Sequence, residues 1–123
     1  MKLDSEVTLQ DVKLQLAKFR DQRDWRKFHD PKNLAEAISI EASELLELFL
    51  WKTPSEIEES IRSDRNYRKD IARELADVFC FSFNMAVALN LDVSSIVRQK
   101  MQENGKKYPV GKSKSKATKY TRL

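Results

Sequence analysis

The chain has 123 residues, 41% hydrophobic and 34% charged, with two glycines and three prolines, which favours one all-α domain over a sheet with many tight turns. Its net charge of +4 comes largely from the C-terminal stretch "GKSKSKATKYTRL", so the charge indicates a basic extension and not a DNA-reading face. The N-terminus lacks the apolar core of a signal peptide, and the longest uncharged run, 78–91, is too short to span a bilayer, so we expect neither secretion nor membrane insertion.

The first half of the chain predicts two helices joined by a loop. Apolar spacing indicates a first helix from Thr8, as the cap, to about Asp24. The segment 25–32 breaks this pattern and contains a proline, so it is predicted to be a loop. Asn33 is then the predicted cap of a second helix, which should reach about Leu50.

A short charged helix and a long apolar one are predicted next. Ser55, with Glu58 three residues later, has the spacing of a capping box and predicts a helix to about Ser63. The long helix should cover 67–89, and its second half lacks charge on every side, as in a helix packed on several faces. Cys80 lies in that half and is expected to be a buried, inert thiol in a reducing, cytoplasmic setting.

A last helix is predicted over 93–104, with Gly105 as its stop. The predicted architecture is therefore an all-α bundle of about four to five helices. Residues 1–105 would form one all-α domain, and 106–123 a basic, mostly irregular tail that is most often a solvated extension.

Glutamates of two kinds occupy the second helix. With about 100° of rotation per residue, Glu41 lies within the apolar stripe centred on Leu34, and Glu44 lies at the edge of that stripe. Glu36 and Glu47 lie on the opposite, solvated face. The sequence therefore predicts that Glu41 and Glu44 face the core.

The long helix repeats this arrangement, because Glu74 and Asp77 share the face of Phe81 and Met85. A buried ionised carboxylate needs a partner, and no lysine or arginine shares either stripe at the right turn. Two such helices packed together would gather four carboxylates, which suits Mg²⁺ or Mn²⁺. The alternative, that these acids are ordinary surface charge, stays open at this point.

Other phosphate-handling motifs are absent from the sequence. It contains no GxxxxGK[ST], HExxH or GxSxG, and both glycines follow residue 104, so no glycine-rich loop can cradle phosphates ahead of a helix. Metal ions and lysines would have to perform that task.

Two short acidic motifs resemble a known signature. "EASE" followed by "ELAD" resembles the ExxE…ExxD pattern of the all-α nucleoside triphosphate pyrophosphohydrolases, the MazG-like family. Four further segments resemble the dCTP pyrophosphatase branch of that family: "RDWRKFHDPKNL", "ELFLWKT", "KMQENGKKYP" and "SKATKYTRL". The resemblance covers most of the chain, in the same order.

The resemblance implies an all-α fold assembled as dimers, usually paired into tetramers as a dimer of dimers, with the choice between dimer and tetramer open. It also implies Mg²⁺-dependent hydrolysis of a nucleoside triphosphate to the monophosphate and pyrophosphate, with Mn²⁺ as a possible substitute. By motif, Glu41, Glu44, Glu74 and Asp77 would hold the metal. Glu41 and Glu44 would be catalytic, and Glu44 is the candidate general base for the attacking water. A dNTP, with dCTP preferred and modified pyrimidines as further candidates, is the implied substrate for nucleotide-pool control.

The resemblance also assigns substrate contacts. Aromatic faces stack on any base, and lysine serves phosphates as a point charge. Taken singly, the two tryptophans are more often core or interface residues, and the histidine more often anchors a loop. The implied substrate-binding residues are Trp25, Arg26, Lys27, Phe28, His29, Trp51, Phe81, Lys100, Asn104, Lys107 and Tyr108.

Two positions depart from the dCTP branch. Phe81 stands where that branch tends to carry a tyrosine, and Leu16 stands where some members place a histidine. A hydroxyl and an imidazole are therefore missing from the expected pocket wall. Because polar partners discriminate among bases, their absence argues against strict selectivity for dCTP.

The alternative is a non-enzymatic function, in which the protein is a helical binding module that uses the basic tail for nucleic acid or a protein partner. The basic stretch "KSKSKATKY" of the tail carries only Tyr120 as an aromatic residue, and inward-facing acids repel phosphate unless metal is present. A small-molecule enzyme is therefore the preferred prediction, with no expected nucleic-acid or membrane partner.

Overall fold

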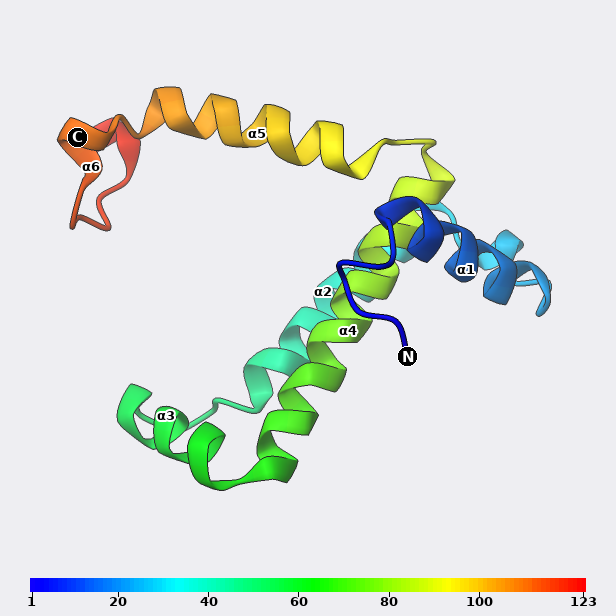
Figure 1. Ribbon diagram of the computed structural model, residues 1–123, viewed down its shortest axis with the longest axis horizontal. Coiled ribbons are helices and arrows are strands. Elements are labelled where there is room, and N and C mark those ends of the chain that lie inside the picture. Colours follow the sequence, from blue (N-terminus) through cyan, green and yellow to red (C-terminus); the bar gives the residue numbers. More distant parts are fainter. The chain divides into compact units, whose positions relative to one another are not determined.

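The computed structural model describes all 123 residues and contains helices but no strands (Figure 1). This confirms the predicted all-α fold. No single helix is long and apolar enough to cross a bilayer. The helices are α1 (Leu9–Asp21), α2 (Pro31–Glu47), α3 (Pro54–Ser63), α4 (Arg65–Ala88), α5 (Val93–Lys107) and α6 (Val110–Ser113), with 3₁₀ turns at η1 (Arg26–Phe28) and η2 (Tyr120–Arg122).

The chain divides into two compact units, Met1–Asn90 and Leu91–Leu123. The first unit holds α1 to α4, and the second holds α5, α6 and η2. The basic segment 106–123 contains the end of α5, one short helix and one 3₁₀ turn. A single catalytic domain over 1–105 stays a prediction.

Side-chain caps start the helices of the first half, and one lies at an unpredicted residue. Thr8 caps α1 as predicted, and the side chain of Asp11 accepts a hydrogen bond from the Thr8 backbone N–H. The prediction of Asn33 as the cap of α2 was wrong. Asp30 is the cap and accepts from the Asn33 N–H at 3.0 Å, because Pro31 occupies the first helical position, where its missing N–H costs nothing.

The cap of α3 was also mispredicted. Thr53 is the cap, and its capping box is made with Glu56, whose side chain accepts from the Thr53 backbone N–H at 2.6 Å. Ser55 and Glu58 have the same spacing but lie inside the helix. Again a proline, Pro54, fits the first helical turn and sets the start two residues earlier.

Helix ends differ from the predictions as well. α1 and α2 each end three residues earlier than expected, and Asp24 and Trp51, in the turns that follow, take left-handed φ values of 53° and 62°. The predicted stop at Gly105 was wrong, since this glycine has no positive φ and α5 continues to Lys107. Pro109 follows, and the residue before a proline is disfavoured in the helical region, which ends α5 instead.

α4 organises the first unit, because it contacts α1, α2 and α3. Figure 1 shows α2 and α4 lying side by side along most of their length. At one end of this pair, the Tyr67 hydroxyl donates to the Leu48 carbonyl oxygen at 2.9 Å, and the Tyr67 ring packs edge-on against Phe49. Only two apolar residues are fully buried, Leu34 at 1% and Ala86 at 4% exposure. The helix pair that holds the predicted acids therefore has a thin core.

Candidate active site

Three of the predicted acids meet between α2 and α4. Glu41 and Glu44 lie one turn apart on α2, and Glu74 faces them from α4. One carboxylate oxygen from each residue lies within 4.8 Å of the others. The periodicity of the two helices thus brings together three of the four acids that the sequence predicts, because acids at i and i+3 share a helix face.

Glu41 is the centre of this cluster electrostatically. Its partial burial raises the pKa of its carboxyl, and the negative charges of Glu44, Asp77 and Glu74 raise that pKa further. Asp77 therefore lies close enough to act on Glu41, although it is not among the three residues whose oxygens converge. Like charges held together in this way are the environment that a hard divalent cation stabilises.

The acidic side chains differ in how exposed they are, which the rotation of about 100° per residue does not predict. Glu41 and Glu74 are half-buried, but Glu44 and Asp77 are exposed, so the prediction that the acids face the core was wrong for these two residues. The position of Glu44 at the edge of the apolar stripe explains why its side chain is exposed. Glu36 and Glu47 are exposed, as predicted.

A cavity of about 290 Å³ adjoins the acid cluster. Asp77 links the two, since it lines the cavity and its charge acts on Glu41 of the cluster. The walls come from α1, the turn around η1 and the second half of α4, and most of them are apolar or aromatic. The lining residues are Leu16, Phe19, Arg20, Trp25, His29, Asp77, Cys80, Phe81 and Asn84.

Two buried polar atoms of this cavity have no hydrogen-bond partner: Nδ1 of His29 and Oδ1 of Asn84. Burial lowers the pKa of His29, and the positive charge of Arg20 lowers that pKa further. Burial also raises the pKa of the Cys80 thiol, with a contribution from Asp77, which fits an inert cysteine. An apolar pocket with a few unpaired polar groups is typical of a small-molecule site.

Comparisons with known proteins agree with this geometry. The model of the MazG-like family matches residues 37–123. The chain belongs to the MazG-like family. It is 39% identical to "dCTP pyrophosphatase 1" of Bos taurus, covering 97% of this chain and 70% of that protein. The corresponding protein of Homo sapiens is 38% identical, over 96% of this chain and 69% of its own length.

A solved structure is also similar to this MazG-like chain. The crystal structure of a pyrophosphatase from Archaeoglobus fulgidus superposes with a TM-score of 0.74 at 36% sequence identity, covering 88% of this chain and 99% of that one. The predicted family and the class of nucleotide pyrophosphohydrolase are therefore confirmed.

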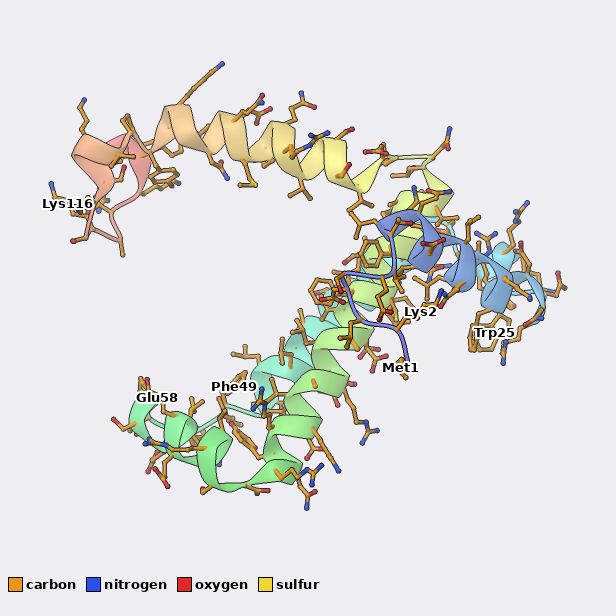
Figure 2. The ribbon with its side chains drawn as sticks, viewed as in Figure 1. Met1, Lys2, Trp25, Phe49, Glu58 and Lys116 are labelled. Atoms are coloured by element: carbon orange, nitrogen blue, oxygen red, sulfur yellow. The ribbon has the colours of Figure 1, made fainter.

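The predicted base-binding residues separate into two groups in this MazG-like chain. Trp25, His29 and Phe81 line the cavity beside the acids, and Figure 2 shows Trp25 in the turn that follows α1. Arg26 lines a neighbouring cavity of about 380 Å³ together with His29. Of the others, Lys27 pairs with Asp24 at 2.7 Å, and Phe28 and Trp51 are exposed, Trp51 at 93%.

The predicted phosphate-binding residues all lie in the second unit. Lys100 pairs with Glu103 at 3.1 Å, and the backbone carbonyl of Asn104 accepts from the Tyr108 N–H at 2.8 Å. The Lys107 ammonium lies 5.2 Å from the ring centroid of Tyr120, and the Tyr120 ring packs edge-on against Tyr108. A role for Lys100, Asn104, Lys107 and Tyr108 in binding phosphate stays a prediction.

Sequence reasoning missed two polar residues of the cavity, Arg20 and Asn84. A signal for both was present. Arg20 lies four residues after Leu16, and Asn84 lies three residues after Phe81, so each shares the helix face of a residue that was already assigned to the pocket wall.

Proposed function

We propose that this nucleotide pyrophosphohydrolase acts on dNTPs, with dCTP preferred, and that it uses a divalent cation, Mg²⁺ with Mn²⁺ as a substitute. One observation carries the proposal: Asp77 lines the aromatic cavity and its charge acts on Glu41 at the centre of the acid cluster. A nucleotide whose base enters the cavity would bring its phosphates to the acids. The name of the Bos taurus and Homo sapiens relatives supports the choice of dCTP.

Glu41, Glu44, Glu74 and Asp77 are the residues that would hold the metal. Their donors are all carboxylate oxygens, which fits a hard cation and excludes a site built from thiolate or imidazole. Burial and the charges of Glu44, Asp77 and Glu74 all raise the pKa of Glu41, and no positive charge is among the causes, which supports a cation held by these four acids. When bound, the cation would neutralise negative charge on the phosphates.

The remaining chemistry is assigned to the chain's side chains. A water molecule attacks the α-phosphorus, the bond from that phosphorus to the α–β bridging oxygen breaks, and the products are the nucleoside monophosphate and pyrophosphate. Glu44 is the proposed general base, because its carboxylate is exposed and can take the proton of the water. Glu41 would orient that water from the half-buried side of the cluster.

Stacking would hold the base. Trp25 and Phe81 supply aromatic faces in the cavity, and such faces accept any base, including modified pyrimidines. Phe81 and Leu16 add no hydrogen bonds from their side chains, so selectivity must come from other polar groups in the wall.

Assembly of this chain into a homo-oligomer, a dimer of dimers, belongs to the proposal. Large apolar side chains are exposed on α2, on α4 and between α2 and α3, and other copies of the chain could cover them. These side chains are Ile40, Leu46, Leu50, Trp51, Leu75 and Phe79. A cytoplasmic setting is also proposed, since the chain's one cysteine is a free thiol.

The test is to incubate the protein with each canonical dNTP and Mg²⁺ and to measure the monophosphate, pyrophosphate and orthophosphate separately. We expect equal amounts of dCMP and pyrophosphate from dCTP, at the highest rate among the four, and no reaction after chelation of the metal. Release of orthophosphate in place of pyrophosphate, or turnover that persists without metal, would contradict the proposal.

A further inference from the structure

The amide of Asn84 is held in one orientation on α4. Its Nδ2 donates to the backbone carbonyl oxygen of Cys80 at 3.0 Å. A carbonyl oxygen can only accept, so the amide cannot turn around without losing this bond. Oδ1 is therefore presented as an acceptor, and it is buried without a partner in a residue that is 7% exposed and lines the cavity.

An unpaired buried acceptor costs the folded protein free energy, because it has lost its hydrogen bonds to water. A site that binds a ligand is one setting in which such a cost persists, because the ligand supplies the missing hydrogen. The complementary group on a ligand of this cavity must be a donor.

Arg20 supplies donors to the same cavity from α1. It is 4% exposed, and its Nε and Nη2 both contact a single oxygen, Oδ1 of Asp21, at 2.8 Å. A guanidinium has five N–H donors, so this ion pair leaves others for a ligand. A group that meets Arg20 should be an acceptor, such as a carbonyl oxygen.

We propose that Asn84 is a specificity-determining residue that selects an amino-pyrimidine: its Oδ1 accepts from the exocyclic N4 amine of cytosine, while Arg20 donates to the O2 carbonyl. The inference rests on the proposed function, since it names how that site distinguishes its substrate. Uracil and thymine carry the O4 carbonyl where cytosine carries the amine, which would set two acceptors against each other. Adenine has an amine but no carbonyl for Arg20.

Asn84→Ala tests the assignment through a ratio, because a residue with a merely structural role changes all substrates alike. We expect the ratio of kcat/KM for dCTP to that for dUTP to fall about tenfold, the value of one neutral hydrogen bond. Ser82→Ala is the matched control. Its Oγ also donates to a backbone carbonyl four residues earlier on α4, that of Val78 at 2.7 Å, but Ser82 is exposed and lies outside the cavity. The control should keep the wild-type ratio.

A substrate variant gives a second readout that needs no mutant protein. The 2-pyrimidinone deoxynucleoside triphosphate keeps O2 but lacks the exocyclic amine. Wild-type protein should use it about tenfold less well than dCTP, and Asn84→Ala should use the two equally. If wild-type protein uses the two equally, the inference is overturned, even where Asn84→Ala fails to fold.

Equilibrium binding separates the inference from the proposed function. If no dNTP yields pyrophosphate, the proposed function fails, and binding of dCMP against dUMP still decides the role of Asn84. Wild-type protein should prefer dCMP and Asn84→Ala should lose that preference. An Asn84→Ala variant that lowers kcat/KM for every dNTP by one factor, or binds dCMP with the wild-type preference, overturns the inference.

Discussion

The hydroxyl of Tyr67, near the start of α4, donates a hydrogen bond to the carbonyl oxygen of Leu48 at the end of α2, 2.9 Å away. The last carbonyl groups of a helix have no partner within it, so this bond satisfies one of them. It also ties the two helices together at one end, and the Tyr67 ring adds an edge-on contact with Phe49. Glu44 and Glu74 depend on this pairing, because they meet only if α2 and α4 keep their register.

Tyr67→Phe should lower the free energy of unfolding by about 1 kcal/mol, because it removes the hydroxyl and leaves the Leu48 carbonyl without that donor. Urea unfolding at one fixed protein concentration measures the change. Tyr120→Phe, whose ring packs in the second unit, is the control and should leave the unfolding of α2 and α4 unchanged. Equal effects of the two variants would show that the hydroxyl of Tyr67 does not hold this pairing.

Glu41→Gln should change activity and stability in opposite directions. Turnover should fall by about 100-fold or more, because the variant removes a charge from the centre of the acid cluster. The metal-free protein should become more stable, since burial and three neighbouring acids disfavour the ionised form of Glu41, whose pKa they raise. Pyrophosphate release and thermal unfolding without metal are the measurements.

Two further variants complete that experiment. Asp77→Asn should also abolish turnover, while Glu47→Gln, on the exposed face of α2, should leave both activity and stability near wild type. Full activity in either Glu41→Gln or Asp77→Asn would show that the four-acid assignment is wrong.

His29 is the only histidine, so its titration can be followed directly by NMR of the ring protons. Burial and the charge of Arg20 hold the pKa of His29 below its ordinary value of 6.5. Below pH 6.5 the unfolded chain therefore binds more protons than the folded one, and stability should fall until the folded histidine is also protonated. His29→Gln should flatten this part of the stability curve, and an NMR pKa above 6.5 would refute the assignment.

Thr53→Ala should destabilise the protein by about 1 kcal/mol, since Thr53 is the cap of α3 and pairs with Glu56. Ser55→Ala is the matched comparison, because Ser55 has the same cap-like spacing to an acid but lies within the helix. Chemical unfolding of the two variants side by side decides between them. A larger loss of unfolding free energy in Ser55→Ala than in Thr53→Ala would show that Ser55 is the cap, as the sequence pattern predicted.

Helical periodicity was enough to predict the acid cluster. Glu41 and Glu74 are half-buried and meet across α2 and α4, because the period of about 3.6 residues alone decides which face each acid occupies. The same reasoning placed Glu44 and Asp77 too far inward, since both side chains are exposed. The exposure of each depends on what packs beside it.

The cavity was harder to predict, because it needs contacts between segments far apart in the chain. Asn84 lies in an uncharged run of α4, so the sequence alone predicts that it is part of a packed helix. Only the contact between α1 and α4 indicates that it lines a cavity. Arginine is seldom fully buried, so the sequence predicts that Arg20 is a surface residue, whereas the structure buries it. Prolines explain the two wrong caps, Asn33 and Ser55, as each helix starts at an Xaa-Pro pair upstream.

The small core around Leu34 and Ala86 has a consequence for how the protein responds to dilution. With so little apolar surface buried inside one chain, the proposed assembly would supply much of the folding free energy by covering the outer faces of α2 and α4. Folding and association would then be a single equilibrium, and the midpoint of thermal unfolding should rise with protein concentration. At low protein concentration the enzyme would then lose activity, because a dissociated chain would lose the pairing of α2 and α4 on which its acid cluster depends.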